Sequence, residues 1–152
     1  MKTFLIPATI FVLLSGCSSN NAFTNFNLTK KQEKSEDSIL SAKILTKEET
    51  VGVVSALYLN RIMPKRYSDK EYFYISFYSK KQFENIEFLL NEHPALSQEE
   101  LEAQNEFSSL ISFDASWQKY YLISFEKSGE KLALKVKFDN FSSKKMIFRK
   151  SD

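Results

Sequence analysis

The chain has 152 residues, 43% of them apolar and 14% aromatic, which is enough for one hydrophobic core and short for two domains. Its 21 basic and 19 acidic residues are scattered and give a formal net charge of +2, so we expect no nucleic acid partner. A single cysteine excludes an internal disulfide, and only 3 Gly and 3 Pro favour a strand-rich domain with few tight turns.

The N-terminus has the pattern of an export signal. A basic start, Met1 and Lys2, precedes an apolar run from Phe4 to Leu14. This run is too short to span a bilayer, for which about 20 residues are needed. We therefore expect residues 1–16 to be a signal peptide that is removed.

The cysteine follows this run directly. The stretch Leu14-Ser15-Gly16-Cys17 resembles the lipobox of bacterial lipoproteins, in which the cysteine thiol is diacylated and the signal is cut just before it. The resemblance implies that Cys17 becomes the first residue of the mature chain and carries the acyl chains. Several acyl chains together anchor a protein stably, so the membrane is an expected partner.

The residues after the cysteine indicate a location and a tether. In the same family, Ser18 rather than Asp after the cysteine favours the outer membrane of a Gram-negative cell, with the domain facing the periplasm or the cell surface. Residues 17–38 are polar and charged and bury little apolar surface, which predicts a flexible tether. We expect residues 39–152 to form one domain.

After the tether, apolar and polar residues alternate with a period of two, which is typical of β-strands. A Ser128-Gly129 pair between the two longest late runs indicates a short hairpin. The predicted strands are 39–45, 50–60, 71–79, 117–126, 131–138 and 144–150.

The middle of the chain allows more than one interpretation. Residues 82–91 fit a strand through Ile86, Phe88 and Leu90, which we favour, or a helix capped by Ser79. Residues 97–107 fit a short helix, because Ser97 and Glu100 have the spacing of a capping box.

Short strands with one brief helix predict an all-β fold, namely an antiparallel two-sheet sandwich of immunoglobulin-like or related topology. A small barrel is the alternative. The pattern from residue 40 onward also resembles the small immunoglobulin-like lipoproteins of Gram-negative envelopes, although no diagnostic motif carries this second resemblance.

The chain offers little catalytic chemistry. His93 is the only histidine, and an acylated Cys17 is a thioether that cannot act as a nucleophile or metal ligand. Gly52 and Gly129 are the only glycines after the signal, so a glycine-rich phosphate loop is absent. We expect a protein without catalytic residues, metal or cofactor.

Tyrosines suggest a binding surface. Five of them fall close together in the sequence with two arginines between them, and tyrosine is frequent at protein interfaces. The alternative is that these rings pack as a second layer on a sheet. The predicted partner surface is Tyr58, Tyr67, Tyr72, Tyr74, Tyr78, Arg61 and Arg66.

These features predict a lipid-anchored, non-enzymatic envelope protein that acts as a protein-binding, adhesion or structural module. The alternative from another class is a periplasmic carrier or assembly factor that holds a lipid-like ligand between its sheets.

Overall fold

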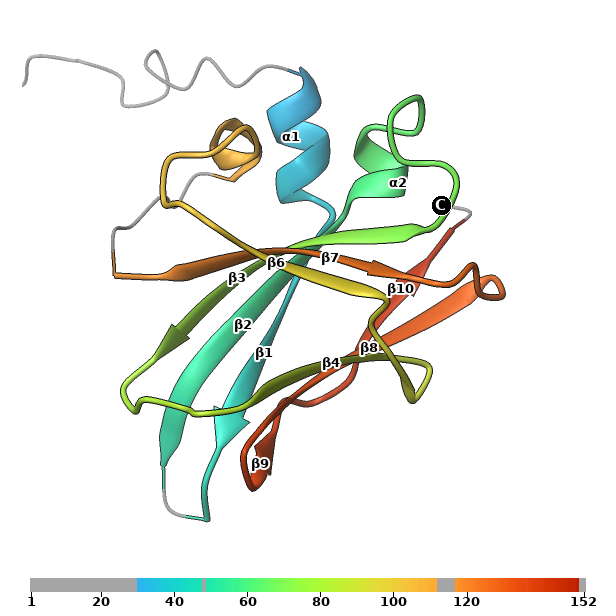
Figure 1. Ribbon diagram of the computed structural model, residues 1–152. Helices are drawn as coiled ribbons and strands as arrows, with labels where there is room; N and C mark the ends of the chain where they lie inside the picture. The colour runs from blue at the N-terminus through green and yellow to red at the C-terminus, as the bar shows by residue number, and fades with distance from the viewer. Residues whose placement is uncertain (1–29, 48, 112–116, 151–152) are drawn as a thin grey trace, which may run out of the picture.

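The computed structural model describes residues 30–47, 49–111 and 117–150 (Figure 1). The signal peptide, Cys17, Ser18 and the first part of the tether lie outside the described residues. Two antiparallel sheets, each of five strands, pack face to face, and helical segments cover part of one of them. The predicted all-β sandwich is therefore confirmed.

The first sheet has the strand order β1-β2-β3-β7-β6, and the second has the order β10-β8-β4-β5, with β9 paired to β8. The strands of the first sheet are β1 (Ile39–Leu45), β2 (Thr50–Tyr58), β3 (Glu71–Ser79), β6 (Ser97–Leu101) and β7 (Lys119–Phe125). Those of the second are β4 (Ile86–Leu90), β5 (His93–Pro94), β8 (Lys131–Phe138), β9 (Phe141–Ser142) and β10 (Met146–Arg149). The helical segments are α1 (Lys30–Glu36), α2 (Leu59–Ile62) and the 3₁₀ turn η2 (Ser108–Leu110).

The strand order of this sandwich differs from that of immunoglobulin domains. Strands β1, β2 and β3 form a meander within one sheet, whereas immunoglobulin domains place their second and third strands in opposite sheets. The two sheets meet along one side through a bridge between Ile44 and Ser143. On the other side the chain passes directly from β5 in the second sheet to β6 in the first.

The main core lies between the sheets and follows the predicted alternation. On β8, Leu132, Leu134, Val136 and Phe138 are fully buried, while the residues between them are half-buried. Strand β3 contributes Phe73, Ile75 and Phe77 to the same core from the opposite sheet.

A second cluster of apolar side chains covers the outer face of the first sheet. Helix α2 and the η2 segment pack there, so the part of this face beneath them is buried as well (Figure 1). Its buried members are Leu57, Leu59, Ile62, Tyr67, Tyr74, Phe107, Leu110 and Tyr120.

The predicted helix over residues 97–107 is wrong. Residues Ser97–Leu101 form strand β6, which pairs antiparallel with β7 from Ser97 opposite Ser124 to Leu101 opposite Tyr120. A helix of two or three turns is marginal by itself, and the exposed backbone of β7 offers the segment a full set of hydrogen bonds. The glutamates stay in solvent in either conformation, so they do not oppose the strand.

Two other expectations about connections also need correction. Strands β7 and β8 belong to different sheets, so Ser128-Gly129 lies in a crossover between the sheets and not in a hairpin. Helix α1 begins at Lys30, inside the predicted tether, because it packs near η2 and buries Ser35 completely. The favoured strand within residues 82–91 is confirmed as β4.

One buried carboxylate joins the two sheets at one end of the sandwich. Glu71, at the start of β3, is 1% exposed. Its oxygens accept hydrogen bonds from the Tyr58 hydroxyl (2.5 Å), the Ser128 backbone N–H (3.0 Å) and the Lys150 Nζ (2.5 Å). Lys150 also donates to the Ser128 carbonyl at 2.7 Å. The network thus links β2 and β3 of one sheet to the crossover and to the segment after β10.

The protonation state of this carboxylate follows from its partners. Burial raises the pKa of Glu71, but the hydrogen bonds from Lys150, Tyr58 and Ser128 outweigh burial and hold the pKa below its ordinary value of 4.5. Burial and the hydrogen bond to Glu71 in turn raise the pKa of Tyr58 far above its usual range. The pair is therefore a carboxylate with a neutral phenol at neutral pH.

We predict that Glu71→Gln lowers the free energy of unfolding at pH 7 by about 3 kcal/mol, because it leaves Lys150 without its partner. Because the pKa of Glu71 is lower in the folded than in the unfolded state, the carboxylate stabilises the fold fully above about pH 4.5. This stabilisation is lost as the pH falls through the pKa of the folded state. Urea unfolding should therefore show the gap between wild type and variant narrowing below about pH 4.5.

The matched control is Glu87→Gln. Glu87 pairs with Lys137 at 3.0 Å in an exposed setting, so its loss should cost less than about 1 kcal/mol. A gap that stays constant from neutral to acidic pH, or a control as costly as Glu71→Gln, would contradict this account.

Candidate functional site

The structure buries most of the predicted tyrosine surface. Tyr58 lies in the main core, and Tyr67 and Tyr74 lie in the second cluster; all three are less than 7% exposed. Only Tyr72 and Tyr78 are half-buried. The alternative that tyrosines pack as a second layer on the sheet thus holds for Tyr67 and Tyr74, and the five rings do not form one surface.

The two predicted arginines do not share one surface. Arg66 makes a two-pronged ion pair with Glu106, one branch at 2.8 Å, and its guanidinium lies over the Tyr67 ring. Arg61, on α2, instead lines a cleft that it shares with Tyr58. The hydrogen bond with Glu106 is the main reason that the pKa of Arg66 is raised.

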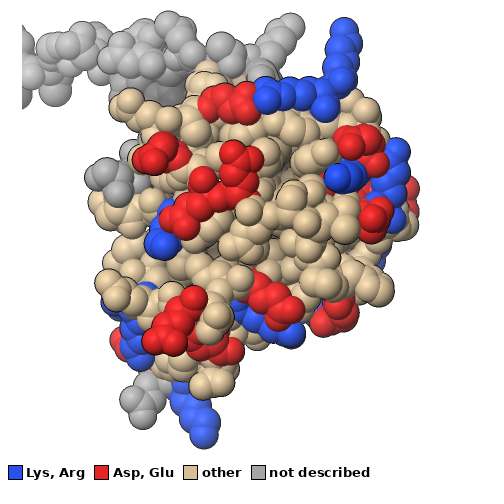
Figure 2. Space-filling view, in the orientation of Figure 1, with Lys and Arg blue, Asp and Glu red and all other residues tan. Residues whose placement is uncertain are grey.

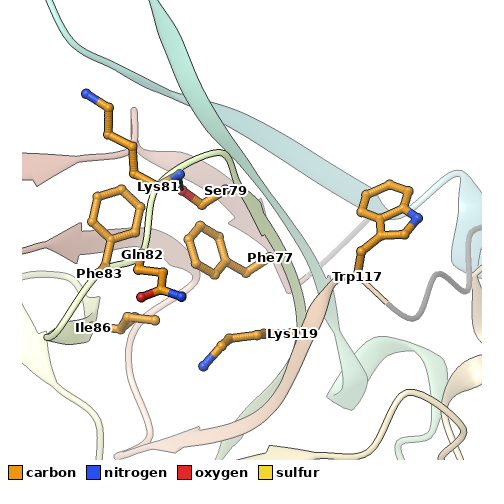
Figure 3. Close-up of a pocket in the computed structure, with 8 residues that line it drawn as sticks. All are labelled: Phe77, Ser79, Lys81, Gln82, Phe83, Ile86, Trp117 and Lys119. Carbon is orange, nitrogen blue, oxygen red and sulfur yellow. Dashed lines mark hydrogen bonds between the residues drawn. The ribbon is translucent and has the colours of Figure 1, made fainter.

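An open groove of about 350 Å³ lies at the other end of β3, and we call it the aromatic groove (Figure 3). The chain contributes to it from the end of β3, the β3–β4 connection and the start of β7. Its lining is Phe77, Ser79, Lys81, Gln82, Phe83, Ile86, Trp117 and Lys119.

The floor of the groove is an extension of the main core. The Phe77 ring stacks on Phe138 with centroids 4.7 Å apart, and Phe83 lies 5.1 Å from Phe138 and 6.0 Å from Phe77. Phe83 is half-buried and stands in the connection that leads from β3 in the first sheet to β4 in the second. Because the floor is held by core packing, the groove is present without a ligand.

The rim carries the most exposed aromatic side chain of the described residues. Trp117 is 64% exposed and meets the Tyr78 ring edge-on, with centroids 5.0 Å apart at 81°. In Figure 3 its indole lies across the strand from the phenyl rings, at one end of the groove. The sequence pattern groups Trp117 with buried residues of β7, but β7 begins at Lys119, so the alternation does not extend to it.

Basic groups flank the apolar floor. Lys119 pairs with Glu100 at 3.4 Å, with both side chains exposed, whereas Lys81 has no ion-pair partner in the part of the chain described. Burial and the nearby Glu100 raise the pKa of Tyr121 to about 12, so its hydroxyl stays neutral. On the face in Figure 2, acidic and basic side chains are interspersed, and no large region of one charge is seen.

Within the described residues, His93 does not belong to a group of potential metal ligands. This histidine lies exposed on β5. Within residues 30–47, 49–111 and 117–150, no three His, Cys, Asp or Glu side chains gather where they could hold a metal. In the same ranges no helix is long and apolar enough to cross a membrane. We take the aromatic groove as the candidate site, because it combines an apolar floor with an exposed indole and two lysines.

Comparison of the chain with known protein families, with curated proteins and with solved structures gives no match.

The sequence could have indicated part of this site. Trp117 follows Asp114 and Ser116, and both residue types are frequent in loops. The proximity of Phe83 to Phe77 depends on how the two sheets pack against each other, and no local pattern reports that.

We predict a large loss of stability for a buried groove residue and a small change for an exposed one. Phe77→Ala should lower the free energy of unfolding by about 3 to 5 kcal/mol, because it opens a cavity in the main core. Trp117→Ala should change it by less than about 1 kcal/mol, because the indole is mostly in solvent. Chemical denaturation of both variants measures the difference. A large loss for Trp117→Ala would mean that the indole is a structural residue and not a free contact group.

Proposed function

We propose that this protein is a lipid-anchored, non-enzymatic module of the bacterial envelope that binds another envelope protein through the aromatic groove. The observation that carries the proposal is the exposed Trp117, braced by Tyr78 beside a preformed apolar floor. Tryptophan and tyrosine supply much of the binding energy in protein interfaces, and an exposed pair next to a groove is a suitable anchor point.

The rim suggests the chemistry of the partner. Lys81 and Lys119 flank a floor made by Phe77, Phe83 and Ile86. Such a groove suits a segment in which an apolar side chain lies next to an acidic one, because the apolar group displaces water from the phenyl rings while the carboxylate meets a lysine.

The position of the groove is compatible with attachment through Cys17. Helix α1 leads into β1 at the end of the sandwich where β3 begins, while the groove lies where β3 ends. Glu71 and Phe77 are six residues apart on β3, about 20 Å at the rise of an extended strand. A partner could therefore reach the groove on a chain held at its N-terminus.

The alternative of a lipid-like ligand held between the sheets receives less support. In the described residues, side chains from both sheets fill this space, and several of them, such as Phe73, Leu134 and Phe138, are completely buried. A carrier of this kind would need an apolar cavity there.

Anchoring makes the first prediction. Wild-type protein expressed in a Gram-negative cell should sediment with the outer membrane, and mass spectrometry should find acyl chains on an N-terminal Cys17. Cys17→Ser should abolish acylation and membrane sedimentation while leaving thermal unfolding of the domain unchanged. An intact protein with a free Cys17 thiol would contradict the proposal.

Partner binding makes the second prediction. A photo-crosslinking residue replacing Gln82, which is exposed at the groove, should give a discrete adduct in cells. Adding Trp117→Ala should reduce the adduct about tenfold or more, as expected for an interface hot spot. Leu96→Ala removes another exposed apolar side chain outside the groove and should leave the adduct unchanged. Equal loss in both variants would exclude a specific role for the groove.

A further inference from the structure

A second cleft, of about 260 Å³, lies at the end of the sandwich opposite the aromatic groove, and we call it the arginine cleft. It is formed where the segment after α1, helix α2 and strand β10 come together. Its lining is Asp37, Ser38, Leu40, Tyr58, Arg61, Ile147, Phe148 and Arg149.

Two arginines that line this cleft have no carboxylate partner among the described residues. Arg61 comes from α2 and Arg149 from β10, and neither forms an ion pair with any carboxylate of the described residues. Asp37 also lines the cleft, but it lies beyond 4.0 Å, the ion-pair distance, from both arginines. The cleft therefore holds more positive than negative charge.

One of these arginines has a donor for which the described residues supply no acceptor. This donor is the Nε atom of Arg61, which is buried. Leaving a buried donor unpaired is unfavourable, and for a charged group the cost is higher. An acceptor that enters the cleft would recover this cost, which favours an anionic oxygen over a neutral ligand.

The rest of the lining is apolar. Leu40 is half-buried, Ile147 is 41% exposed, and Phe148 packs against the Tyr58 ring with centroids 6.4 Å apart. The Tyr58 hydroxyl is directed to Glu71, so Tyr58 presents carbon to the cleft. An anion that carries an apolar group would match both parts of this surface.

The Glu71 network fixes the cleft in place. Lys150, next to Arg149, is held by Glu71 and by the Ser128 carbonyl, so its ammonium is not available to a ligand. This leaves Arg61 and Arg149 as the cationic groups, positioned by helix and strand and not by a loop.

We propose that the arginine cleft binds a phosphate ester, with phosphate oxygens on Arg61 and Arg149 and the apolar part of the ester on Leu40 and Ile147. A guanidinium donates two parallel N–H hydrogen bonds to a phosphate group. Two guanidinium groups can therefore bind several oxygens of one phosphate. The ester is a phospholipid headgroup or a soluble phosphate ester. The inference depends neither on acylation of Cys17 nor on the aromatic groove.

Calorimetric titration of the whole chain in dodecyl maltoside at low salt tests it, with two probes. These are the soluble ester phenyl phosphate and the short-chain lipid dihexanoyl phosphatidylglycerol. Binding of the lipid alone supports a headgroup site, and equal binding of phenyl phosphate supports a soluble ester. Arg61→Gln and Arg149→Gln should each weaken binding of the active probe about tenfold, the effect of losing a charged hydrogen bond.

The matched control is Arg66→Gln, which removes a guanidinium elsewhere on the surface and should leave the affinity within about twofold. Arg149 is exposed, so its variant is expected to fold even if Arg61→Gln does not, and thermal unfolding checks both. Failure of both probes to bind, or binding that Arg149→Gln leaves unchanged, would overturn the proposal.

Discussion

The carboxylate of Glu71 is the constraint on which the arrangement of the two sheets depends. A buried charge is tolerated only when its hydrogen bonds are satisfied, and here the donors come from β2, from the crossover after β7 and from the segment after β10. The three segments must therefore meet at one point. This requirement fixes the position of one sheet relative to the other. Apolar packing between the sheets fixes it less specifically.

The two candidate binding regions lie at opposite ends of the sandwich, and only the arginine cleft lies at the Glu71 end. At the Glu71 end, the sheets are tied together, and the side chains around the tie leave the arginine cleft. At the other end of β3, the backbone bridge between Ile44 and Ser143 joins the sheets along one side, and the rings of Phe77 and Phe83 line the aromatic groove. One end of the sandwich is thus suited to a small anion and the other to an apolar segment.

The sequence predicts the strands well and the surface poorly, for physical reasons that particular residues make clear. Alternation on β8 directly reports burial between two sheets, so Leu132 to Phe138 could be assigned. The capping-box pattern at Ser97 predicted a helix because it reports only a local preference. The hydrogen bonds that the segment forms with β7 outweigh this preference. Tyr58 and Tyr74 could be core or surface on pattern alone. The arginine cleft joins residues from distant segments, and no spacing in the sequence indicates that Arg61 and Arg149 share it.

Strand β6 lies at the edge of its sheet and presents unpaired backbone groups on one side. Such an edge can add the strand of another molecule, and repeated addition gives fibres. Proteins confined to a membrane surface meet in two dimensions at high local density, which would favour this addition. The exposed Glu99 and Glu100 place like charges along the edge, so two β6 strands repel each other. On the proposed anchored protein, these glutamates would keep neighbouring copies separate and leave the groove and the cleft free.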